Sequence, residues 1–486
     1  MKILYAASEA LPYIASGGLA DVAGSLPRAL NEAGHDCRVV LPLYAGIRQD
    51  LRDKLEYMTN FYVPVSWRNQ YCGVFKGIEN GVTYYLLDNE YYFKRNGIYG
   101  HYDDAERFTF FSRAILEMLK HIDFMPDVIN ANDWQTALVP VYYSLFYRSQ
   151  PGFGNIKTVF TIHNIQYQGK YGMELCTEII GLPKDAWHIV EYENCCNFMK
   201  GAFETADKIT TVSPTYAQEI LNPYFSHGLD PVLWSKQYKL CGFLNGIDQD
   251  VYNPMTDPAL PAHFSAEDKA GKAECKKCLL EEMGLPVGKE PIMAIITRLV
   301  AHKGIDLIKC VFEDMVRLGY KFVILGSGDK QYEDFFREMA YRYPDRVAAK
   351  IGFIPDLAHR IYAGADMFLM PSQSEPCGLS QMVALRYGTI PIVRETGGLK
   401  DSITDCGGPG GNGFTFKTYN AHDMLDATVR ARAYYDKRMM WGKLVSHALS
   451  RTSAGDAPPS CTLVCTEKLW ANLFTKEKFC DTITDV

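Results

Sequence analysis

The stretch KILYAASEALPYIASGGLADVAGSLPRALNEA, residues 2–33, decides the fold. Its first part, Lys2–Ser8, is a short apolar run that predicts a strand, and Leu19–Ala33 has apolar residues at helical spacing. A loop with two glycines separates them. A strand, a loop and a helix in this order form the unit from which parallel α/β sheets are built.

The same alternation recurs in two series. The first predicts strands at 37–42, 127–131, 157–162 and 208–212, with helices at 105–120 and 134–147. The second begins at Pro291 and predicts strands at 292–297, 321–325, 348–351, 367–370 and 390–393, with helices starting near 305, 331, 357 and 379. The fold class that follows is α/β, with two Rossmann-like domains facing each other across a cleft.

Two features mark the edges of these series. Residues 61–88 alternate aromatic and β-branched side chains around Glu79-Asn80-Gly81, a hairpin signal that predicts an antiparallel insertion or sheet edge. Four prolines lie between 253 and 290, which places a hinge nearby. We put the boundary near Gly242, giving domains at 1–241 and 242–451 and an atypical tail at 452–486.

The amino-acid composition and net charge of the chain narrow the classes of molecule that it is expected to bind. With 486 residues, 47% apolar and 22% charged, the chain has the makeup of a globular two-domain protein. A formal charge of -7 gives no general attraction for nucleic acid or anionic lipid. Because no signal-peptide pattern or run of 18 apolar residues occurs, we expect a cytoplasmic protein without nucleic-acid or membrane partners.

The 14 cysteines are scattered, which predicts reduced thiols. Cys275-x-x-Cys278 has no second pair or nearby histidine at zinc spacing, so we expect a solvated helix there and no metal site. The adjacent Cys195 and Cys196 are expected to pack on a helix.

The loops after the predicted strands contain the candidate site residues, since such loops face the ligand cleft. In Ser16-Gly17-Gly18, the glycines let a ligand approach the backbone, and the following helix offers N–H groups to an anion. A tight turn that binds nothing is the alternative.

The segment 297–304 places Arg298 and Lys303 directly after a strand. Two fixed cations at that position suit a diphosphate leaving group, whose developing negative charge they stabilise. A solvated loop is the alternative interpretation.

Two further loops follow neighbouring strands of the second series. Glu375, in the loop 371–380, can fix sugar hydroxyls or simply cap the next helix. The loop 394–399 repeats the glycine pattern one unit later. In the first series, His163 and Asp133 end strands and can bind a sugar, or act as a structural histidine and a helix cap.

Several motifs in order resemble those of the bacterial glycogen synthase and plant starch synthase family, within the retaining GT-B glycosyltransferases. The motifs are Ser8–Ala10, Gly17–Val22, Asp133-Trp134, His163-Asn164, Asn245–Asp248, Arg298 with Lys303-Gly304, Glu375–Leu379 and Thr396–Leu399. The resemblance covers about residues 1 to 450, and it rests on the combination of motifs rather than on any one of them.

This resemblance implies a hexosyltransferase with ADP-glucose as donor, an α-1,4-glucan (glycogen or a maltooligosaccharide) as acceptor, and no cofactor or metal. The first domain would be the acceptor side and the second the nucleotide-sugar side. The catalytic residues implied are His163, Arg298, Lys303 and Glu375. The substrate-binding residues implied are Ser16, Gly17, Gly18, Asp21, Tyr99, Asp133, Asn245, Cys377, Gly378, Leu379, Thr396, Gly397 and Gly398.

The chain departs from the family at two places. The family has a lysine before Gly-Gly-Leu, where this chain has Ser16, so a cation expected near the donor is missing. After Arg451 the sequence TSAGDAPPSCT replaces the family's ending, as a reading-frame shift would, and predicts a poorly ordered tail. A transferase using UDP-glucose and a glucan-binding protein with impaired catalysis remain alternatives.

Overall fold

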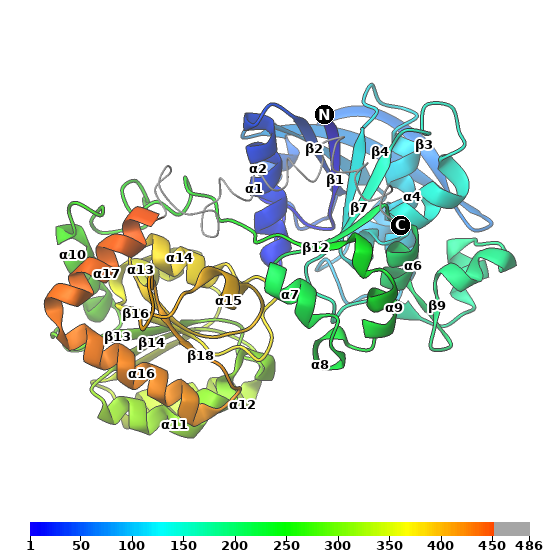
Figure 1. Ribbon diagram of the computed structural model, residues 1–486. Helices are drawn as coiled ribbons and strands as arrows, with labels where there is room; N and C mark the ends of the chain where they lie inside the picture. The colour runs from blue at the N-terminus through cyan, green and yellow to red at the C-terminus, as the bar shows by residue number, and fades with distance from the viewer. Residues whose placement is uncertain (452–486) are drawn as a thin grey trace. The chain divides into compact units, whose positions relative to one another are not determined.

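The computed structural model describes residues 1–451, which form two compact units divided between Phe243 and Leu244 (Figure 1). Each unit has its own hydrophobic core. The sequence-based boundary near Gly242 falls on the last residue of a strand of the first unit. The predicted tail, 452–486, lies outside the described residues.

The first unit is built on a nine-stranded sheet in the order β12-β11-β7-β6-β1-β2-β5-β4-β3. The strands are β1 (Lys2–Ala6), β2 (Asp36–Pro42), β3 (Glu56–Val65), β4 (Arg68–Glu79), β5 (Val82–Asp88), β6 (Val128–Asn132), β7 (Lys157–Ile162), β11 (Lys208–Thr211) and β12 (Leu240–Gly242). The neighbours from β12 to β5 pair in parallel, and β4 runs antiparallel to both of its neighbours, β5 and β3. The parallel architecture predicted from the strand and helix alternation is confirmed.

The hairpin between β4 and β5 turns at Asn80 and Gly81, which have φ of 51° and 77°. Positive φ at both central residues is what a tight two-residue hairpin requires. The predicted antiparallel segment is therefore confirmed, and it forms one edge of the sheet, with β3 outermost (Figure 1).

The helices of the first unit follow the predicted pattern. They are α1 (Gly18–Glu32), α2 (Gln49–Arg52), α3 (Glu90–Phe93), α4 (Asp104–Met118), α5 (Leu138–Tyr142), α6 (Phe198–Thr205), α7 (Pro214–Glu219), α8 (Pro223–Ser226) and α9 (Asp230–Ser235). Shorter 3-10 and π turns are η1 (Trp134–Thr136), η2 (Tyr143–Tyr147), η3 (Cys176–Ile180), η4 (Lys184–Ile189) and η5 (Gln237–Lys239). The helix expected at 134–147 thus consists of η1, α5 and η2.

A small antiparallel sheet corrects one expectation. It has the order β8-β10-β9, with β8 (Lys170–Tyr171), β9 (Glu191–Tyr192) and β10 (Cys195–Asn197). Cys195 and Cys196 therefore lie on a strand and not on a helix. The short run 195–197 becomes extended because it pairs with residues distant in the chain, which a local pattern cannot reveal.

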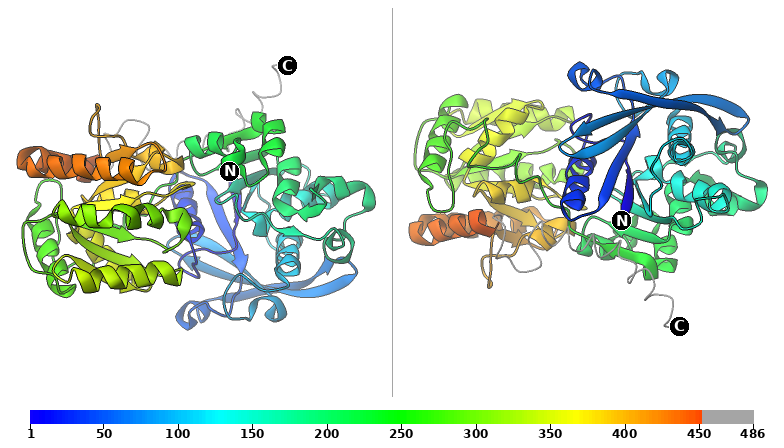
Figure 2. Two further views of the ribbon diagram at one scale, coloured as in Figure 1. Left: turned by 90° about the horizontal axis from the view of Figure 1, so that it is seen from below. Right: turned by 90° about the horizontal axis from the view of Figure 1, so that it is seen from above.

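The second unit is a six-stranded parallel sheet in the order β15-β14-β13-β16-β17-β18. Its strands are β13 (Ile292–Ile296), β14 (Lys321–Gly326), β15 (Val347–Ile351), β16 (Met367–Met370), β17 (Ile390–Arg394) and β18 (Phe414–Phe416). Its helices are α10 (Ala270–Glu282), η6 (Ala301–Lys303), α11 (Ile305–Arg317), α12 (Lys330–Arg342), α13 (Pro355–Gly364), α14 (Ser380–Arg386), α15 (Gly397–Ser402), α16 (Ala421–Asp436) and α17 (Arg438–Arg451). Helices lie on both faces of this sheet, as the views in Figure 2 also show.

The lysine-rich helix α10 is less solvated than its composition predicts. The Nζ of Lys272 donates to the carbonyl oxygens of Ala363, Ala365 and Tyr387 at 2.8–3.1 Å. Cys275 on the same helix is buried, so α10 packs against α13 with one face. Each cysteine that the structure describes is a free thiol.

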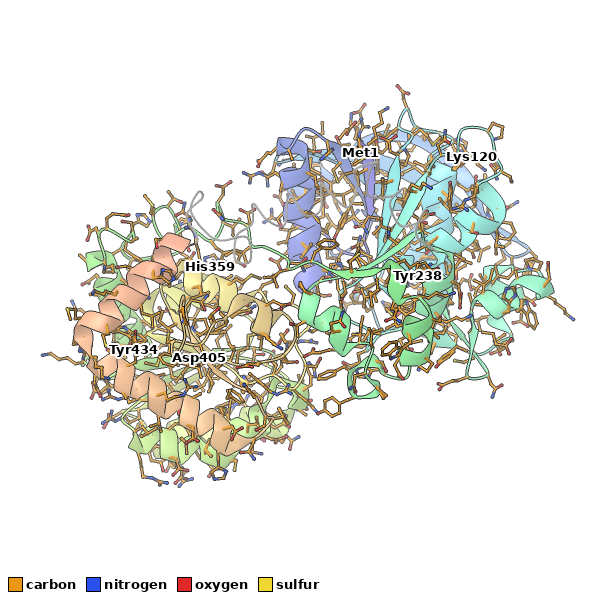
Figure 3. All side chains as sticks on the ribbon, viewed as in Figure 1. Met1, Lys120, Tyr238, His359, Asp405 and Tyr434 are labelled. Atoms are coloured by element: carbon orange, nitrogen blue, oxygen red, sulfur yellow. The ribbon has the colours of Figure 1, made fainter. Side chains whose placement is uncertain are left out.

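The proline-rich segment after residue 253 belongs to the second unit. Its Asp257 is buried, and one carboxylate oxygen lies 2.6 Å from Nδ1 of His359 on α13. Figure 3 labels His359. The hydroxyl of Tyr387 donates to the same oxygen. This network holds the segment against α13 and the end of α14.

Candidate active site

In the first unit, the predicted residues gather at the carboxyl ends of β1, β6 and β7, which are neighbours in the sheet. The loop 7–17 follows β1, Asp133 follows β6, and His163 follows β7. The parallel topology therefore brings together residues that lie far apart in the sequence.

Asp133 holds the end of β7 in place. Its Oδ1 accepts hydrogen bonds from the backbone N–H of His163 at 2.7 Å and of Asn164 at 3.2 Å. Burial raises the pKa of this carboxyl to about 7, opposed by those two N–H groups and reinforced by the charge of Glu9. Its side chain makes no capping bond to η1, so the helix-cap interpretation is wrong.

His163 is a neutral imidazole with a defined tautomer. Its Nε2 lies 2.9 Å from Oδ1 of Asn132, whose Nδ2 donates to the carbonyl oxygen of Ala6 at 3.0 Å. Because the amide oxygen of Asn132 must then be an acceptor, the proton of His163 resides on Nε2. Burial lowers the pKa of His163 to about 3, which excludes a positive charge near neutral pH.

Glu9 is a site residue that the sequence reasoning missed. Its carboxylate is buried and accepts from both the backbone N–H and the hydroxyl of Ser16. Burial raises the pKa of Glu9, whereas its bonds to Ser16 and Gly17 lower it. The sequence feature that points to Glu9 is a single acidic residue directly after an apolar strand, within the motif Ser8–Ala10.

The remaining residues of this part of the site surround Glu9. Gly17 precedes α1 in an extended conformation, and a Cβ added there would lie 3.8 Å from the Glu9 carboxylate. Helix α1 begins at Gly18 and has Asp21 in its first turn. The hydroxyl of Tyr99 lies 2.7 Å from Oγ of Ser8, and burial raises the pKa of that phenol well above its usual range.

In the second unit, the predicted residues lie on loops after β13, β16 and β17, again neighbouring parallel strands. The Nζ of Lys303 donates to Oε2 of Glu375 at 2.6 Å, and Oγ of Ser372 donates to the same oxygen at 2.9 Å. Glu375 is only 7% exposed. The helix after this loop has no side-chain cap, so Glu375 pairs with a cation rather than capping α14.

Arg298 differs from Lys303. Its side chain is exposed, and among residues 1–451 no carboxylate forms an ion pair with it. Lys303, which forms an ion pair with Glu375, and Arg298, which forms none within residues 1–451, both follow strand β13. Together they give this loop a net positive character even with Glu375 ionised.

Two glycines allow the loops after β16 and β17 to pack closely against each other. Gly397 has φ of 44°, and a Cβ there would lie 2.0 Å from the carbonyl oxygen of Glu375. The N–H of Gly398 donates to that same oxygen at 3.1 Å, and a Cβ on Gly398 would lie 2.1 Å from the carbonyl oxygen of Cys377. Thr396, just before them, is fully buried. Only glycine fits at positions 397 and 398.

Cys377 packs as a buried thiol beside Asn245. Burial raises the pKa of Cys377 to about 12, although hydrogen bonds from Asn245 oppose this effect. Such a thiol is protonated and is not a nucleophile. Gly378 follows with φ of 68°, and Leu379 then leads into α14.

Gln381 is the second residue that the sequence reasoning missed. Its side chain is buried, and its Nε2 donates to the carbonyl oxygens of Cys377 at 3.1 Å and Gly378 at 2.9 Å, and to Oγ of Ser402 at 3.1 Å. It therefore ties the loop after β16 to α15. A polar residue in the first turn of a short helix gives no sequence signal for this role.

The described residues contain neither a candidate metal cluster nor a candidate membrane span. No cluster of three or more histidine, cysteine, aspartate or glutamate side chains in this part of the chain could hold a metal ion. No helix within residues 1–451 is long and apolar enough to cross a membrane.

Two family models match the chain. Residues 2–235 match the starch synthase catalytic domain, and residues 282–443 match the glycosyl transferases group 1. The two matched ranges contain the two groups of site residues described above, except for Asn245.

Curated relatives match over nearly the whole length. The chain is 48% identical over 455 residues to a glycogen synthase of Bacillus cereus (strain B4264), covering 93% of this chain and 96% of that protein. It is 46% identical over 456 residues to a glycogen synthase of Anoxybacillus flavithermus, covering 93% and 94%.

Two solved structures have folds similar to that of this chain. The catalytic domain of Starch Synthase IV from Arabidopsis thaliana, bound to ADP and acarbose, superposes with a TM-score of 0.88 at 34% identity, covering 97% of this chain and 98% of that one. A sucrose-phosphate synthase from Thermosynechococcus elongatus, at 15% identity and a TM-score of 0.60, shares the fold. The predicted class, two Rossmann-like α/β units of the GT-B type, is confirmed. This chain belongs to the glycogen and starch synthase family of hexosyltransferases.

Proposed function

We propose that this protein transfers glucose from ADP-glucose to the non-reducing end of an α-1,4-glucan, with retention of the anomeric configuration. The observation that supports this most is the loop after β13, which bears Arg298 and Lys303 and whose Lys303 bonds to the buried Glu375. Fixed cations beside a sugar-binding carboxylate suit a nucleotide-diphosphate sugar. The family membership and the ADP in the Arabidopsis relative favour the same donor.

In this proposal the second unit binds the donor. Arg298 gives the diphosphate a planar bidentate contact and Lys303 a point charge, and both stabilise the negative charge that develops as the glycosidic bond breaks. Glu375 and the backbone of 377–379 surround the transferring glucose. The loop 396–398 and Asn245 complete this side.

The first unit supplies contacts to sugar hydroxyls. Asp133 and His163 bind the donor glucose, and Asp21 faces it from the first turn of α1. The turn 16–18 lies beside them, and Tyr99 is proposed as an acceptor contact. Carboxylates accept hydrogen bonds from hydroxyls, which suits a neutral sugar better than a phosphate.

Retention is proposed to arise by attack of the acceptor hydroxyl on the same face from which ADP leaves. The bond from the anomeric carbon to the diphosphate oxygen breaks, and an oxocarbenium-like state forms. The acceptor oxygen then bonds to that carbon, and its proton passes to the departing phosphate. Cys377 does not act as a nucleophile in this scheme, because burial keeps its thiol protonated.

The experiment is a comparison of ADP-glucose with UDP-glucose, using glycogen as the acceptor and excess chelator in a parallel series. We expect glucose incorporation from ADP-glucose, release of the product by an α-1,4-specific glucosidase, and no loss with chelator because side chains supply the charge. Preference for UDP-glucose would refute the donor assignment. Activity that disappears with chelator and returns with magnesium would refute the role of the two cations. A cytoplasmic location remains a prediction that cell fractionation tests.

A further inference from the structure

Four polar side chains lie together in the sheet of the first unit, on neighbouring interior strands. They are Asn130 and Asn132 on β6, Thr161 on β7 and Thr210 on β11, and all four are fully buried. Interior strands of a parallel sheet usually have apolar side chains on both faces. A buried amide or hydroxyl lowers stability unless it is hydrogen bonded, so this group needs an explanation other than strand packing.

These four residues, which we call the polar chain, form a continuous run of hydrogen bonds that ends at His163. Nε2 of His163 lies 2.9 Å from Oδ1 of Asn132, and Nδ2 of Asn132 lies 3.4 Å from Oδ1 of Asn130. Nδ2 of Asn130 donates to Oγ1 of Thr161 at 2.8 Å. Oγ1 of Thr161 lies 2.8 Å from Oγ1 of Thr210. The polar chain therefore crosses three neighbouring strands and has one end in the candidate site.

The contacts of Asn132 determine the orientation of its side-chain amide. Its Nδ2 donates to the carbonyl oxygens of Ala6 at 3.0 Å and of Asn130 at 3.1 Å. The opposite orientation would turn Oδ1 toward these two carbonyl oxygens, so acceptors would face acceptors. Asn132 therefore presents its oxygen to His163, and an amide oxygen can only accept a hydrogen bond.

This acceptor opposite Nε2 decides what the other ring nitrogen of His163 can do. Because Nε2 must carry the hydrogen, Nδ1 of a neutral ring has none and is an acceptor. Burial lowers the pKa of His163 to about 3, which keeps the ring neutral. His163 is partly exposed, and no donor among residues 1–451 bonds to Nδ1. Nδ1 is thus available to a ligand.

We propose that Asn132 is a positioning residue that holds His163 as the Nε2–H tautomer, so that Nδ1 accepts a hydrogen bond from a hydroxyl of the transferring glucose. The inference rests on the proposed function, in which His163 contacts the donor sugar. The rest of the polar chain bonds the side-chain amide of Asn130, which in turn accepts from Asn132. Each of the two buried amides therefore both donates and accepts, as buried polar groups in native proteins generally do.

A purely structural role of the polar chain makes a different prediction. If these bonds only tied β6 to β7, removing one would lower stability and leave turnover and the position of the proton unchanged. In the proposed role, leucine at position 132 leaves the Nε2–H of His163 facing an apolar group. An unpaired buried donor costs free energy, so the proton moves to Nδ1 and the sugar hydroxyl loses its acceptor.

The test compares the full-length wild type with Asn132→Leu and with Thr158→Val as a matched control. Thr158 lies near the start of β7, is 1% exposed, and donates through its hydroxyl to Oδ2 of Asp207 at 3.0 Å, outside the polar chain. NMR of protein with ¹⁵N-labelled histidine rings shows which ring nitrogen carries hydrogen. The signals of His163 are assigned by their absence in His163→Gln. Kinetics with ADP-glucose and glycogen, and thermal melting, are measured on the same proteins.

We expect the hydrogen on Nε2 in wild type and on Nδ1 in Asn132→Leu. The kcat of Asn132→Leu should fall about fivefold, the effect of one neutral hydrogen bond, with the KM for glycogen unchanged. Thr158→Val should melt at a lower temperature but keep the wild-type tautomer and kcat.

Hydrogen on Nδ1 in the wild type would overturn the proposal, and this measurement needs no variant to fold. A proton that stays on Nε2 in Asn132→Leu would overturn it as well, as would equal losses of kcat in Asn132→Leu and Thr158→Val. The NMR measurement requires no substrate. Failure of the transferase assay alone therefore concerns the proposed function and not the tautomer.

Discussion

Arg298 and Lys303 follow the same strand but are held differently, and this difference separates their effects on catalysis and stability. Lys303 neutralises the buried Glu375, whereas Arg298 is exposed and forms no ion pair within residues 1–451. Removing either cation should lower kcat by at least about a hundredfold, since a preorganised charge contributes roughly 2.7–4 kcal/mol to the transition state.

The two alanine variants, at Arg298 and at Lys303, should differ in thermal stability. Arg298→Ala should leave the melting temperature unchanged, whereas Lys303→Ala leaves Glu375 buried without its cation and should cost about 1–3 kcal/mol. Lys303→Ala/Glu375→Gln should recover stability and not activity. Steady-state kinetics and thermal melting measure both effects, and near-normal turnover in both single variants would contradict the assignment to the leaving group.

Asp133 should make stability depend on pH. Its folded-state pKa of about 7 lies above the ordinary value, so the folded protein keeps a proton that the unfolded chain releases between about pH 4 and 7. The stabilisation is present below that interval and is lost as the pH rises through about 7. Asp133→Asn preserves the acceptor for the N–H of His163 and removes the charge.

We therefore expect the melting temperature of Asp133→Asn, relative to wild type, to increase between pH 5 and pH 8. Melting curves of both proteins in matched buffers measure this difference. A difference that stays flat over the range would mean that Asp133 titrates normally, and one that decreases would mean that the carboxylate is stabilised.

The contacts of Ser16 bear on where a lysine would have to stand to supply the cation that this chain lacks before Gly17-Gly18. Both the N–H and the hydroxyl of Ser16 bind Glu9, so a lysine at 16 would place its ammonium beside that buried carboxyl. Ala15 is exposed one residue earlier. A charged hydrogen bond exceeds a neutral one by about 1–2 kcal/mol, which corresponds to roughly five- to thirtyfold in rate.

We expect Ala15→Lys to raise kcat/KM for ADP-glucose by that factor and Ser16→Lys to raise it less. The measurement is a side-by-side kinetic assay with glycogen in excess. An increase in Ser16→Lys alone would show that the serine, and not the alanine, occupies the place of the cation.

Among the elements, the loops after β16 and β17 depend on glycines that cannot be replaced. Gly397→Ala would bring a Cβ to 2.0 Å from the carbonyl oxygen of Glu375 and force a residue with φ of 44°. The loop bearing Glu375 must then shift, so kcat should fall about tenfold or more while most of the fold persists. Gly442→Ala on α17 is the matched control, because its Cβ would meet nothing within 4 Å. Equal activity of the two variants would contradict the locked arrangement of the loops.

The elements that sequence predicts well are short buried strands with a clear composition. Strands β7 and β16 have the predicted bounds, because β16 is entirely apolar and β7 is rich in β-branched and aromatic residues. The three-residue strands β12 and β18 and the small sheet were missed, since they form through pairing with distant segments. Glu9 and Gln381 were missed for a related reason. Their roles depend on partners that only the folded chain brings within hydrogen-bonding distance.

At the scale of the whole molecule, the two units differ in the charge of their site residues. The first unit brings together the carboxyl groups of Glu9 and Asp133, with Asp21 nearby in α1. The second has Lys303 against one buried carboxylate and an exposed Arg298 in the same loop. A diphosphate is repelled by the first set and attracted by the second, whereas neutral sugar hydroxyls can bond to carboxylates.

This asymmetry predicts where ADP alone binds. Adding ADP without sugar should slow amide hydrogen exchange in the segments 298–304, 375–379 and 396–399 of the second unit, because binding lowers the population of locally open states there. The loop 16–18 and the segment 133–135 of the first unit should exchange at their original rates. Maltooligosaccharide without nucleotide is the matched control and should leave the second-unit segments unaffected. The measurement is hydrogen exchange followed by mass spectrometry with and without saturating ADP. Protection of the first-unit loop with no change in the second would mean that the backbone N–H groups at the start of α1, and not the cations after β13, hold the diphosphate.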